Sequence, residues 1–284
     1  MSRIVITLGD PAGIGPEVTR KALESGQLPA GFEFDVVGDE AAGTPGQPDE
    51  RSARAAFDAL KEAARRLIAG EADAVVTAPA SKEQLQRSGF RFPGQTEFFA
   101  DALGVDDFAM CLSGDRLTVG LATIHEPLAK VPELLTIDGI VRTGLLLAKF
   151  LARKGGVPRI AVAGLNPHAG ENGAFGDEEK RIIAPAIERL NAAGVACFTG
   201  PEVPDAVFRD AARGRFDGVL AMYHDQGLIP LKLLDFDTAV NVTLGLPKPR
   251  TSPDHGTAFG IAGKNLADPS SMIRAIRLAC EMVG

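Results

Sequence analysis

The 284-residue chain has little of what marks nucleic-acid-binding or membrane proteins. Acidic residues outnumber basic ones, 37 to 30, and the formal net charge is −7, whereas nucleic acids and anionic membranes attract basic surfaces. No apolar run reaches the ~18 residues that a membrane-spanning helix needs. We therefore expect neither nucleic acid nor a membrane as a partner, and an anionic substrate would need a local cluster of Lys and Arg.

Cysteine is also scarce. The three cysteines, Cys111, Cys197 and Cys280, lie far apart and form no CxxC pair. An odd, dispersed set argues against a disulfide framework and for reduced thiols, most simply three small buried hydrophobes. The N-terminus reads as a strand without the pattern of a signal peptide, so we expect a cytoplasmic protein.

The common nucleotide-binding fingerprints are missing as well. Residues 9–17, GDPAGIGPE, have glycines at positions 9, 13 and 15. This spacing is not GxGxxG, and no Gly-Lys-Ser/Thr follows to make a P-loop. A tight turn between a strand and a helix is the simpler interpretation, and a loop that cradles phosphate is the alternative.

Apolar runs of strand length alternate with longer segments of helical periodicity, and no internal repeat is apparent. The expected strands are 4–8, 34–37, 74–77, 109–112, 117–123, 160–163, 219–222 and 240–243. The expected helices are 53–69, 96–103, 136–154, 177–193 and 270–282, and the Gly/Pro-rich residues 41–50 read as a loop. This alternation is typical of an α/β fold with a largely parallel sheet, although no linker marks a domain boundary.

Three of the four histidines follow likely buried strands. His125, His168 and His224 are each among the first strongly polar groups after an apolar run. Ligands of open α/β sheets bind at the carboxyl ends of strands, and imidazole is the commonest protein ligand of transition metals. The rings could therefore converge on one ion. Because HExxH and similar spacings are absent, three hydrogen-bonded structural histidines remain the alternative.

The motifs around these histidines give the chain a clear resemblance. It resembles the 4-hydroxythreonine-4-phosphate dehydrogenase family of vitamin B6 biosynthesis over nearly its whole length. GLNPHAGE and YHDQG are the most specific of the shared motifs. The matching stretches are ITLGDPAGIGPE (6–17), TAPASK (77–82), PGQTEFFA (93–100), GLNPHAGENGAFGDEE (164–179), MYHDQGLIPLK (222–232) and VNVTLGLPKPRTSPDHGTAFGIAGK (240–264).

The resemblance implies a divalent metal bound by His125, His168 and His224, with ligands drawn from both subunits of a homodimer. Three neutral imidazoles suit Zn²⁺ best or Co²⁺, whereas Mg²⁺, a less suitable candidate, usually prefers oxygen. Asp225 follows His224 and is a candidate to orient that ring or to act as a general base. A helix N-cap is the structural alternative for Asp225.

The family's contacts to its phosphorylated substrate map to Thr96, Lys232, Asn241 and Arg250, and Lys232 is also a candidate catalytic group. Lys and Arg would supply the positive charge that the acidic chain otherwise lacks. Family members usually have a histidine where this chain has Gln95, a position that contacts substrate. An amide cannot titrate, so any proton transfer at that position is lost.

A broader resemblance covers residues 255–269, HGTAFGIAGKNLADP, which are similar to the adenosine-binding loop of isocitrate and isopropylmalate dehydrogenases. It implies that His255, Gly256, Thr257 and Ala258 contact the adenine end of NAD or NADP, and that His255 is not a metal ligand. Small residues allow the backbone to approach a flat ring closely.

The implied fold is isopropylmalate-dehydrogenase-like. Two α/β/α domains share a continuous mixed sheet, and the active site lies in the cleft between them. Residues 1–100 with 240–284 would form the first domain. Residues 101–239 would form the second, dimerising one.

The implied reaction is metal-dependent, NAD(P)-linked oxidation of 4-phosphohydroxy-L-threonine with decarboxylation to 3-amino-2-oxopropyl phosphate, for pyridoxal phosphate biosynthesis. The alternative is a dehydrogenase of 4-phospho-D-threonate or 4-phospho-D-erythronate in sugar-acid catabolism. Gln95 and a chain that is short between Gly38 and Arg51 keep this alternative open. A metal-dependent lyase or hydrolase without a dinucleotide, and a non-catalytic binding protein, are more remote alternatives.

Overall fold

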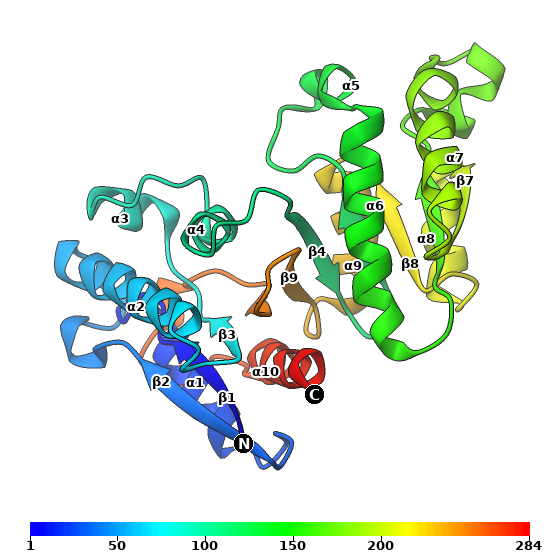
Figure 1. The fold of residues 1–284 in the computed structure, drawn as a ribbon. Helices are drawn as coiled ribbons and strands as arrows, with labels where there is room; N and C mark the ends of the chain where they lie inside the picture. Colours follow the sequence, from blue (N-terminus) through cyan, green and yellow to red (C-terminus); the bar gives the residue numbers. More distant parts are fainter. The chain divides into compact units, whose positions relative to one another are not determined.

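A computed structural model describes residues 1–284, and its contacts divide the chain into two compact units. Unit 1 comprises residues 1–106 and 240–284, and unit 2 comprises residues 107–239. Both ends of the chain thus belong to unit 1 (Figure 1). Strands and helices alternate along the chain in both units, which confirms the expected α/β class.

The strands of unit 1 are β1 (Ser2–Thr7), β2 (Phe32–Val37), β3 (Ala74–Thr77), β9 (Val240–Leu244) and β10 (Arg250–Pro253), in the order β2-β1-β3-β10-β9. Neighbouring strands are parallel except for the antiparallel pair β10–β9. Ile4, Val5 and Ile6 of β1 are completely buried. Such a continuous apolar run is typical of a parallel strand with both faces covered.

The helices of unit 1 are α1 (Gly15–Glu24), α2 (Glu50–Ile68), α3 (Lys82–Arg87), α4 (Gln95–Ala102) and α10 (Ser270–Val283). Val5 of β1 packs in one core with Leu60 of α2 and Phe99 of α4. Ile4 and Ile6 point to the opposite face of the sheet, where α10 packs on β1 and β10 and contacts α1. Unit 1 is therefore a three-layer α/β/α sandwich.

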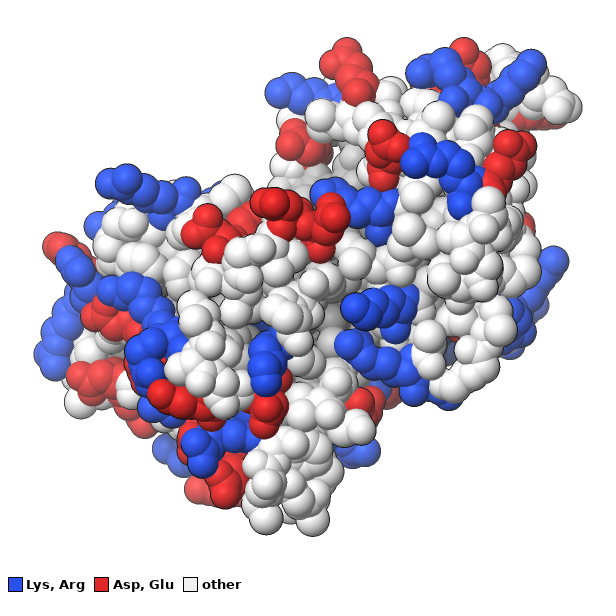
Figure 2. Space-filling model, in the orientation of Figure 1, with Lys and Arg blue, Asp and Glu red and all other residues white.

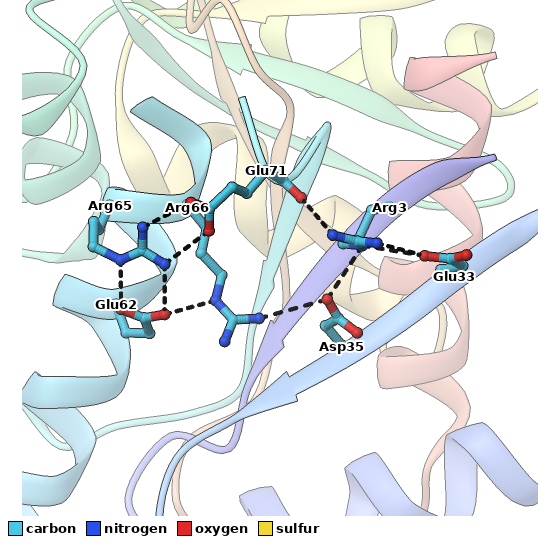
Figure 3. Close-up of polar contacts among 7 residues, drawn as sticks. All are labelled: Arg3, Glu33, Asp35, Glu62, Arg65, Arg66 and Glu71. Atoms are coloured by element: carbon cyan, nitrogen blue, oxygen red, sulfur yellow. Dashed lines mark hydrogen bonds and ion pairs between the residues drawn. The ribbon is translucent and has the colours of Figure 1, made fainter. Parts of the chain in front are cut away.

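A network of exposed ion pairs joins α2 to the first two strands of unit 1 (Figure 3). Glu62 accepts hydrogen bonds from Arg65 and Arg66, and Arg66 also pairs with Asp35 of β2. Glu62 is the most strongly perturbed acid of the network, because these two guanidinium groups lower its pKa to about 2. The network comprises Arg3, Glu33, Asp35, Glu62, Arg65, Arg66 and Glu71.

The strands of unit 2 are β4 (Ala109–Ser113), β5 (Thr118–Leu121), β6 (Arg159–Ala163), β7 (Cys197–Glu202) and β8 (Gly218–Ala221), in the order β4-β5-β8-β6-β7. Only β4 and β5 form an antiparallel pair, and the other pairs are parallel. This arrangement places β5, β8 and β6 side by side in the same direction.

The helices of unit 2 are α5 (Val131–Leu134), α6 (Ile137–Leu151), α7 (Ala184–Ala192), α8 (Pro204–Ala212) and α9 (His224–Asp235). Phe208 of α8 and Leu231 of α9 pack in one core with Val219 of β8. Helix α6 contacts β5, β8 and α7.

Several sequence expectations need correction. The single helix expected over 177–193 is a π-helical segment, Glu179–Ile183, followed by α7. The residues 41–50 are not wholly loop, because a short 3-10 helix, Glu40–Ala42, overlaps them and α2 already begins at Glu50. Cys197 is exposed, whereas Cys111 and Cys280 are buried as expected. Burial raises the pKa of Cys111 to about 12, so this thiol stays protonated at neutral pH.

None of the helices is both long and apolar enough to cross a membrane. On the face drawn in Figure 2, acidic and basic side chains are interspersed over both units.

Candidate active site

The three histidines expected to bind metal all follow strands that lie next to one another. His125 comes four residues after β5, and His168 comes five residues after β6. His224 comes three residues after β8 and is the first residue of α9. Strand β8 pairs in parallel with both β5 and β6. The three loops therefore leave the same edge of the sheet, the edge where α/β proteins bind ligands.

Two of the three rings are already close to each other. The ring centroids of His125 and His224 lie 5.4 Å apart at an interplanar angle of 44°. Two imidazoles that bind one tetrahedral ion with metal–nitrogen distances of about 2.0–2.1 Å have centroids about 5 Å apart. His168 instead packs against Phe175, with ring centroids 6.1 Å apart. No group of three His, Cys, Asp or Glu side chains suited to a metal is assembled within the single chain.

Asp225 holds the ring of His224. Its Oδ1 lies 2.6 Å from His224 Nδ1, so the Nε2 atom of that ring is the one left for a ligand. The N-cap alternative for Asp225 is wrong, because the N-cap of α9 is Tyr223 and no side chain caps this helix. Asp225 lies inside the first turn and is exposed.

His168 lies in an unusual left-handed segment. His168, Ala169, Glu171 and Asn172 all have positive φ, between 39° and 56°, a conformation that residues other than glycine adopt at a cost in free energy. The buried carboxylate of Glu179 fixes the start of this loop by accepting hydrogen bonds from the backbone N–H groups two and three residues before His168, at 2.7 and 2.8 Å. Glu179 is a site residue that the sequence did not single out.

In unit 1, Arg250 forms the centre of a polar pocket. Its Nη2 donates to Thr77 Oγ1 at 2.7 Å and to Gln95 Oε1 at 3.0 Å. Its Nη1 donates to the hydroxyls of Thr96 and Thr243 at 3.2 and 3.3 Å. Strands β3, β10 and β9 and the start of α4 thus meet at one guanidinium. The structure brings Gln95, Thr96 and Arg250 together, as the sequence predicted.

Arg250 forms no ion pair within the chain, and only the carboxylate of Glu97 in α4 acts on its charge, without contacting it. The residue is only 4% exposed, all four of its hydrogen-bond partners are neutral, and its Nε is buried without a partner. Burial lowers the pKa of Arg250 to about 10, so the group is still positively charged at neutral pH. An unpaired buried cation is expensive, and its natural complement is an anion.

The backbone around Arg250 favours the same kind of ligand. Gln95 and Thr96 form the first turn of α4, and the helix has no side-chain cap. The free N–H groups of a helix N-terminus attract anions. On β9, Asn241 lies two residues before Thr243 and so points to the same face of the sheet, and Asn241 Oδ1 is buried without a hydrogen-bond partner. Lys232 lies on α9 in unit 2.

Thr77 and Thr243 were not anticipated as site residues. Both lie within motifs shared with the family, but a threonine near the end of a strand is ordinary in sequence. Only the pairing of β3 with β10 and of β10 with β9 shows that the two hydroxyls flank one guanidinium. Thr77 lies on β3 and Thr243 on β9, the two strands on either side of β10, and only the strand order reveals this.

The loop expected to bind the dinucleotide is open and has an unsatisfied polar atom. His255 Nε2 is buried without a hydrogen-bond partner. A Cβ atom placed on Gly256 would meet nothing within 4 Å, so space lies over the backbone there. Ala258 adopts a left-handed conformation with φ of 43°. These features fit a loop that a flat ring approaches closely.

Residues 9–17 pack against this loop and form a hydrogen bond to it. Thr257 O accepts a hydrogen bond from Ile14 N at 2.9 Å, and a Cβ on Gly13 would lie only 2.8 Å from that same oxygen. Glycine at position 13 therefore permits a close backbone approach. The GDPAGIGPE segment is a tight strand-to-helix turn packed on the 255–258 loop, which favours the simpler of its two interpretations.

Comparisons with known proteins agree with this geometry. Residues 16–279 match the family model described as pyridoxal phosphate biosynthetic protein PdxA. The chain is 45% identical to the 4-hydroxythreonine-4-phosphate dehydrogenase of Erythrobacter litoralis, over 98% of this chain and 96% of that protein. The alignment extends over 322 residues, so the relative has insertions that this shorter chain lacks.

Solved structures give the same result. A crystal structure of 4-hydroxythreonine-4-phosphate dehydrogenase from Klebsiella pneumoniae matches with a TM-score of 0.83 and 37% identity, over 100% of both chains. Isocitrate dehydrogenase from Methylococcus capsulatus matches at 16% identity with a TM-score of 0.54, over 100% of this chain and 85% of the other. This second likeness concerns the fold alone and confirms the expected relationship to that dehydrogenase fold.

Proposed function

The chain belongs to the PdxA family, and from this premise we propose how its residues carry out the family's reaction. It is an oxidoreductase of the 4-hydroxythreonine-4-phosphate dehydrogenase type, acting in pyridoxal phosphate biosynthesis. The substrate is 4-phosphohydroxy-L-threonine. Oxidation of its hydroxyl gives a β-keto acid, which loses carbon dioxide to leave 3-amino-2-oxopropyl phosphate.

The unpaired charge of Arg250 is the observation that carries this proposal. A buried guanidinium with neutral partners and a free Nε is complementary to a phosphate, which accepts several N–H bonds at once. Arg250, with Thr96 and Asn241, would hold the phosphate and so fix the reacting carbon at a defined distance from it.

His125, His168 and His224 would hold the divalent metal of this family. The two rings 5.4 Å apart and the His224–Asp225 pair fit imidazole coordination, and three neutral nitrogens favour Zn²⁺ or Co²⁺ over Mg²⁺. A bound divalent ion supplies Lewis-acid polarisation of the hydroxyl to be oxidised. Asp225 keeps His224 in the tautomer that leaves Nε2 free, and it is the carboxylate nearest to this centre for accepting a proton.

The 255–258 loop would bind the adenine end of NAD or NADP, which supplies the hydride acceptor. His255 contributes the unsatisfied Nε2 and Gly256 the open backbone. Because Ile14 donates to Thr257 O, the 9–17 turn holds this loop in place.

The active form would be a homodimer that shares its metal sites. Ile229, Leu233 and Phe236 are 66%, 83% and 63% exposed, and their spacing along α9 forms one apolar stripe. The stripe borders a groove of about 640 Å³ that is also lined by Phe208 and Asp225. Exposed apolar patches of this kind mark interaction surfaces. A second copy seated here would lie beside His224 and complete a ligand set that one chain does not assemble.

The direct test is turnover of 4-phosphohydroxy-L-threonine by the purified protein with NAD or NADP and with Zn²⁺, Co²⁺ or Mg²⁺. His168→Ala is expected to abolish turnover and remove the bound metal. The matched variant His255→Ala is expected to keep the metal and to raise the KM for the dinucleotide. Turnover by a metal-free His168→Ala protein would refute the metal assignment, and equal turnover of the unphosphorylated amino acid would refute the phosphate site.

Gln95 favours one second candidate, oxidation of 4-phospho-D-threonate or 4-phospho-D-erythronate. Gln95 Oε1 accepts from Arg250, so this side chain contributes an amide to the pocket in place of the family's usual histidine. A hydroxy acid without the amino group would meet a different hydrogen-bonding partner here. The ratio of kcat/KM for the amino acid and the two sugar acids decides between the candidates.

A further inference from the structure

A chain of short hydrogen bonds joins the three loops that carry the histidines. Thr123 Oγ1, in the His125 loop, donates to the carbonyl of Met222 at 2.7 Å. Met222 N, directly after β8, donates to Gln226 Oε1 at 2.7 Å. Gln226 Nε2 donates to the carbonyl of Gly164, directly after β6, at 2.7 Å. We call Thr123, Met222, Gln226 and Gly164 the loop brace.

Gln226 is the central member, and only a primary amide suits its position. The side chain is 92% buried and meets a group that can only donate, Met222 N–H, and one that can only accept, Gly164 C=O. A carboxylate accepts but does not donate, and an apolar side chain does neither. Either change would leave a buried backbone group without a partner.

The brace fixes where each histidine loop begins. Gln226 lies two residues after His224 in the first turn of α9, and Gly164 lies four residues before His168. Both hydrogen bonds of Gln226 therefore set the separation between the loops of His224 and His168, while Thr123 ties the His125 loop to the same carbonyl end of β8. Glu179 holds the next two residues of the His168 loop.

We propose that Gln226 is a positioning residue for the metal centre, which sets the relative placement of the histidine loops without touching the ion. This inference rests on the proposed metal site. Residues that orient metal ligands without touching the ion typically weaken metal binding by about 10–100-fold when they are removed. Without them the ligands are mobile in the metal-free protein, and ordering them on binding costs part of the binding free energy.

The test replaces Gln226 by Met, which has a similar length and makes no comparable hydrogen bond, and by Glu, which keeps only the acceptor. Competition with a chromophoric chelator is expected to show Co²⁺ binding weakened about 10–100-fold in both variants. The visible spectrum of bound Co²⁺ should also change shape, because the coordination geometry is less constrained. Thr123→Val, which removes only the hydroxyl, should give a smaller effect in the same direction.

Two controls separate positioning from general destabilisation. Gln86→Met makes the same replacement at an exposed position of α3, and Val219→Ala opens a cavity in the buried strand β8 without removing a brace hydrogen bond. Both should bind Co²⁺ like the wild type. The proposal is overturned if Gln226→Met binds Co²⁺ with wild-type affinity and spectrum, or if Val219→Ala weakens binding equally.

Hydrogen exchange in the metal-free protein tests the loop brace independently of the metal proposal. The amide of Met222 should exchange faster in Gln226→Met than in the wild type, because its acceptor is gone, whereas unchanged exchange would contradict the brace itself. Failure of wild-type protein to bind Co²⁺, or binding that survives His168→Ala, would instead refute the metal assignment.

Discussion

Asp225 Oδ1 lies 2.6 Å from Nδ1 of its neighbour His224. Asp225 has two candidate roles, which predict different results. It orients the His224 ring as a metal ligand, or it accepts a proton as a general base. If Asp225 orients the ring, Asp225→Ala should weaken Co²⁺ binding about 10–100-fold, and Asp225→Asn, which retains an acceptor oxygen, should weaken it less. If Asp225 is only a general base, both variants should keep their metal and lose kcat. Chelator competition and steady-state kinetics on the same samples distinguish these results.

Arg250 is expected to contribute to binding at the expense of stability. Arg250→Met removes a buried charge that forms no ion pair, so its Tm should not fall, while its KM for the phosphorylated substrate should rise at least about 100-fold. Inorganic phosphate should raise the Tm of the wild type and not that of the variant. Arg87→Met, at an exposed position of α3, is the control. An equal rise in the KM for NAD would show that Arg250 does not act at the substrate phosphate.

Because Gln95 does not titrate, we expect kcat/KM of the wild type to lack the pH dependence that a histidine at this position would cause. Gln95→His introduces a group with an ordinary pKa of about 6.5, and the adjacent cation of Arg250 should lower that pKa because it disfavours a second positive charge. The profile of log kcat/KM against pH should gain an inflection below pH 6.5 that the wild type lacks. A profile that keeps the wild-type shape would mean that the side chain at this position does not act in proton transfer.

The apolar stripe on α9 is expected to be a subunit interface. Leu233→Glu should convert the dimer into a monomer in sedimentation experiments, because a charge cannot be buried there without a partner. Loss of bound metal should accompany the change. Val157→Glu places the same charge at another exposed apolar residue of unit 2 and should remain dimeric. A Leu233→Glu monomer with full metal content would show that the ligands come from one chain.

Glu62 should contribute a pH-dependent part of the stability. Its pKa is lowered from 4.5 to about 2 by Arg65 and Arg66, so its contribution is complete above the unfolded-state pKa and is lost as the pH falls toward 2. Because the side chain is partly exposed, Glu62→Gln should lower Tm by at most about 4 °C at pH 7. The difference in Tm between the two proteins should shrink steadily as the pH falls below 4.5 and should vanish only below pH 2, where Glu62 is protonated in both the folded and the unfolded state. A difference of the same size at pH 7 and about pH 3 would exclude the ion pairs as its cause.

The strands that are apolar throughout could be located from the sequence, whereas two elements that carry site residues, α9 and β10, could not. Helix α9 contains Gly227 and Pro230, two residues that normally interrupt a helix. Its glycine is required by packing, since a Cβ there would lie 2.6 Å from Val119 of β5. Strand β10, with the sequence RTSP, lacks apolar alternation altogether, and its buried Arg250 and Thr251 form hydrogen bonds to other elements of unit 1.

The residues of the candidate site likewise fall into those that the sequence could name and those that only the structure reveals. Motif resemblance was sufficient to name Gln95, Thr96 and Arg250, and the structure places Gln95 and Thr96 each within hydrogen-bonding distance of Arg250. It did not identify Thr77 or Gln226, whose importance lies in strand order and in backbone groups of distant loops. Glutamine and threonine are common residues, and a sequence does not show which carbonyl a side chain will meet.

Unit 1 is built from two separate segments of the chain, and this affects the order in which the two units fold during synthesis. Unit 2 is one uninterrupted segment, residues 107–239, so all its strands are synthesised before β9. Unit 1 must wait for the last residues of the chain, since β10 pairs with β3 and supplies Arg250. Because domains tend to fold as units during translation, the histidine loops can be formed on a nascent chain whose anion pocket does not yet exist. Premature termination after residue 239 would thus release a unit that carries the three proposed metal ligands and lacks Arg250.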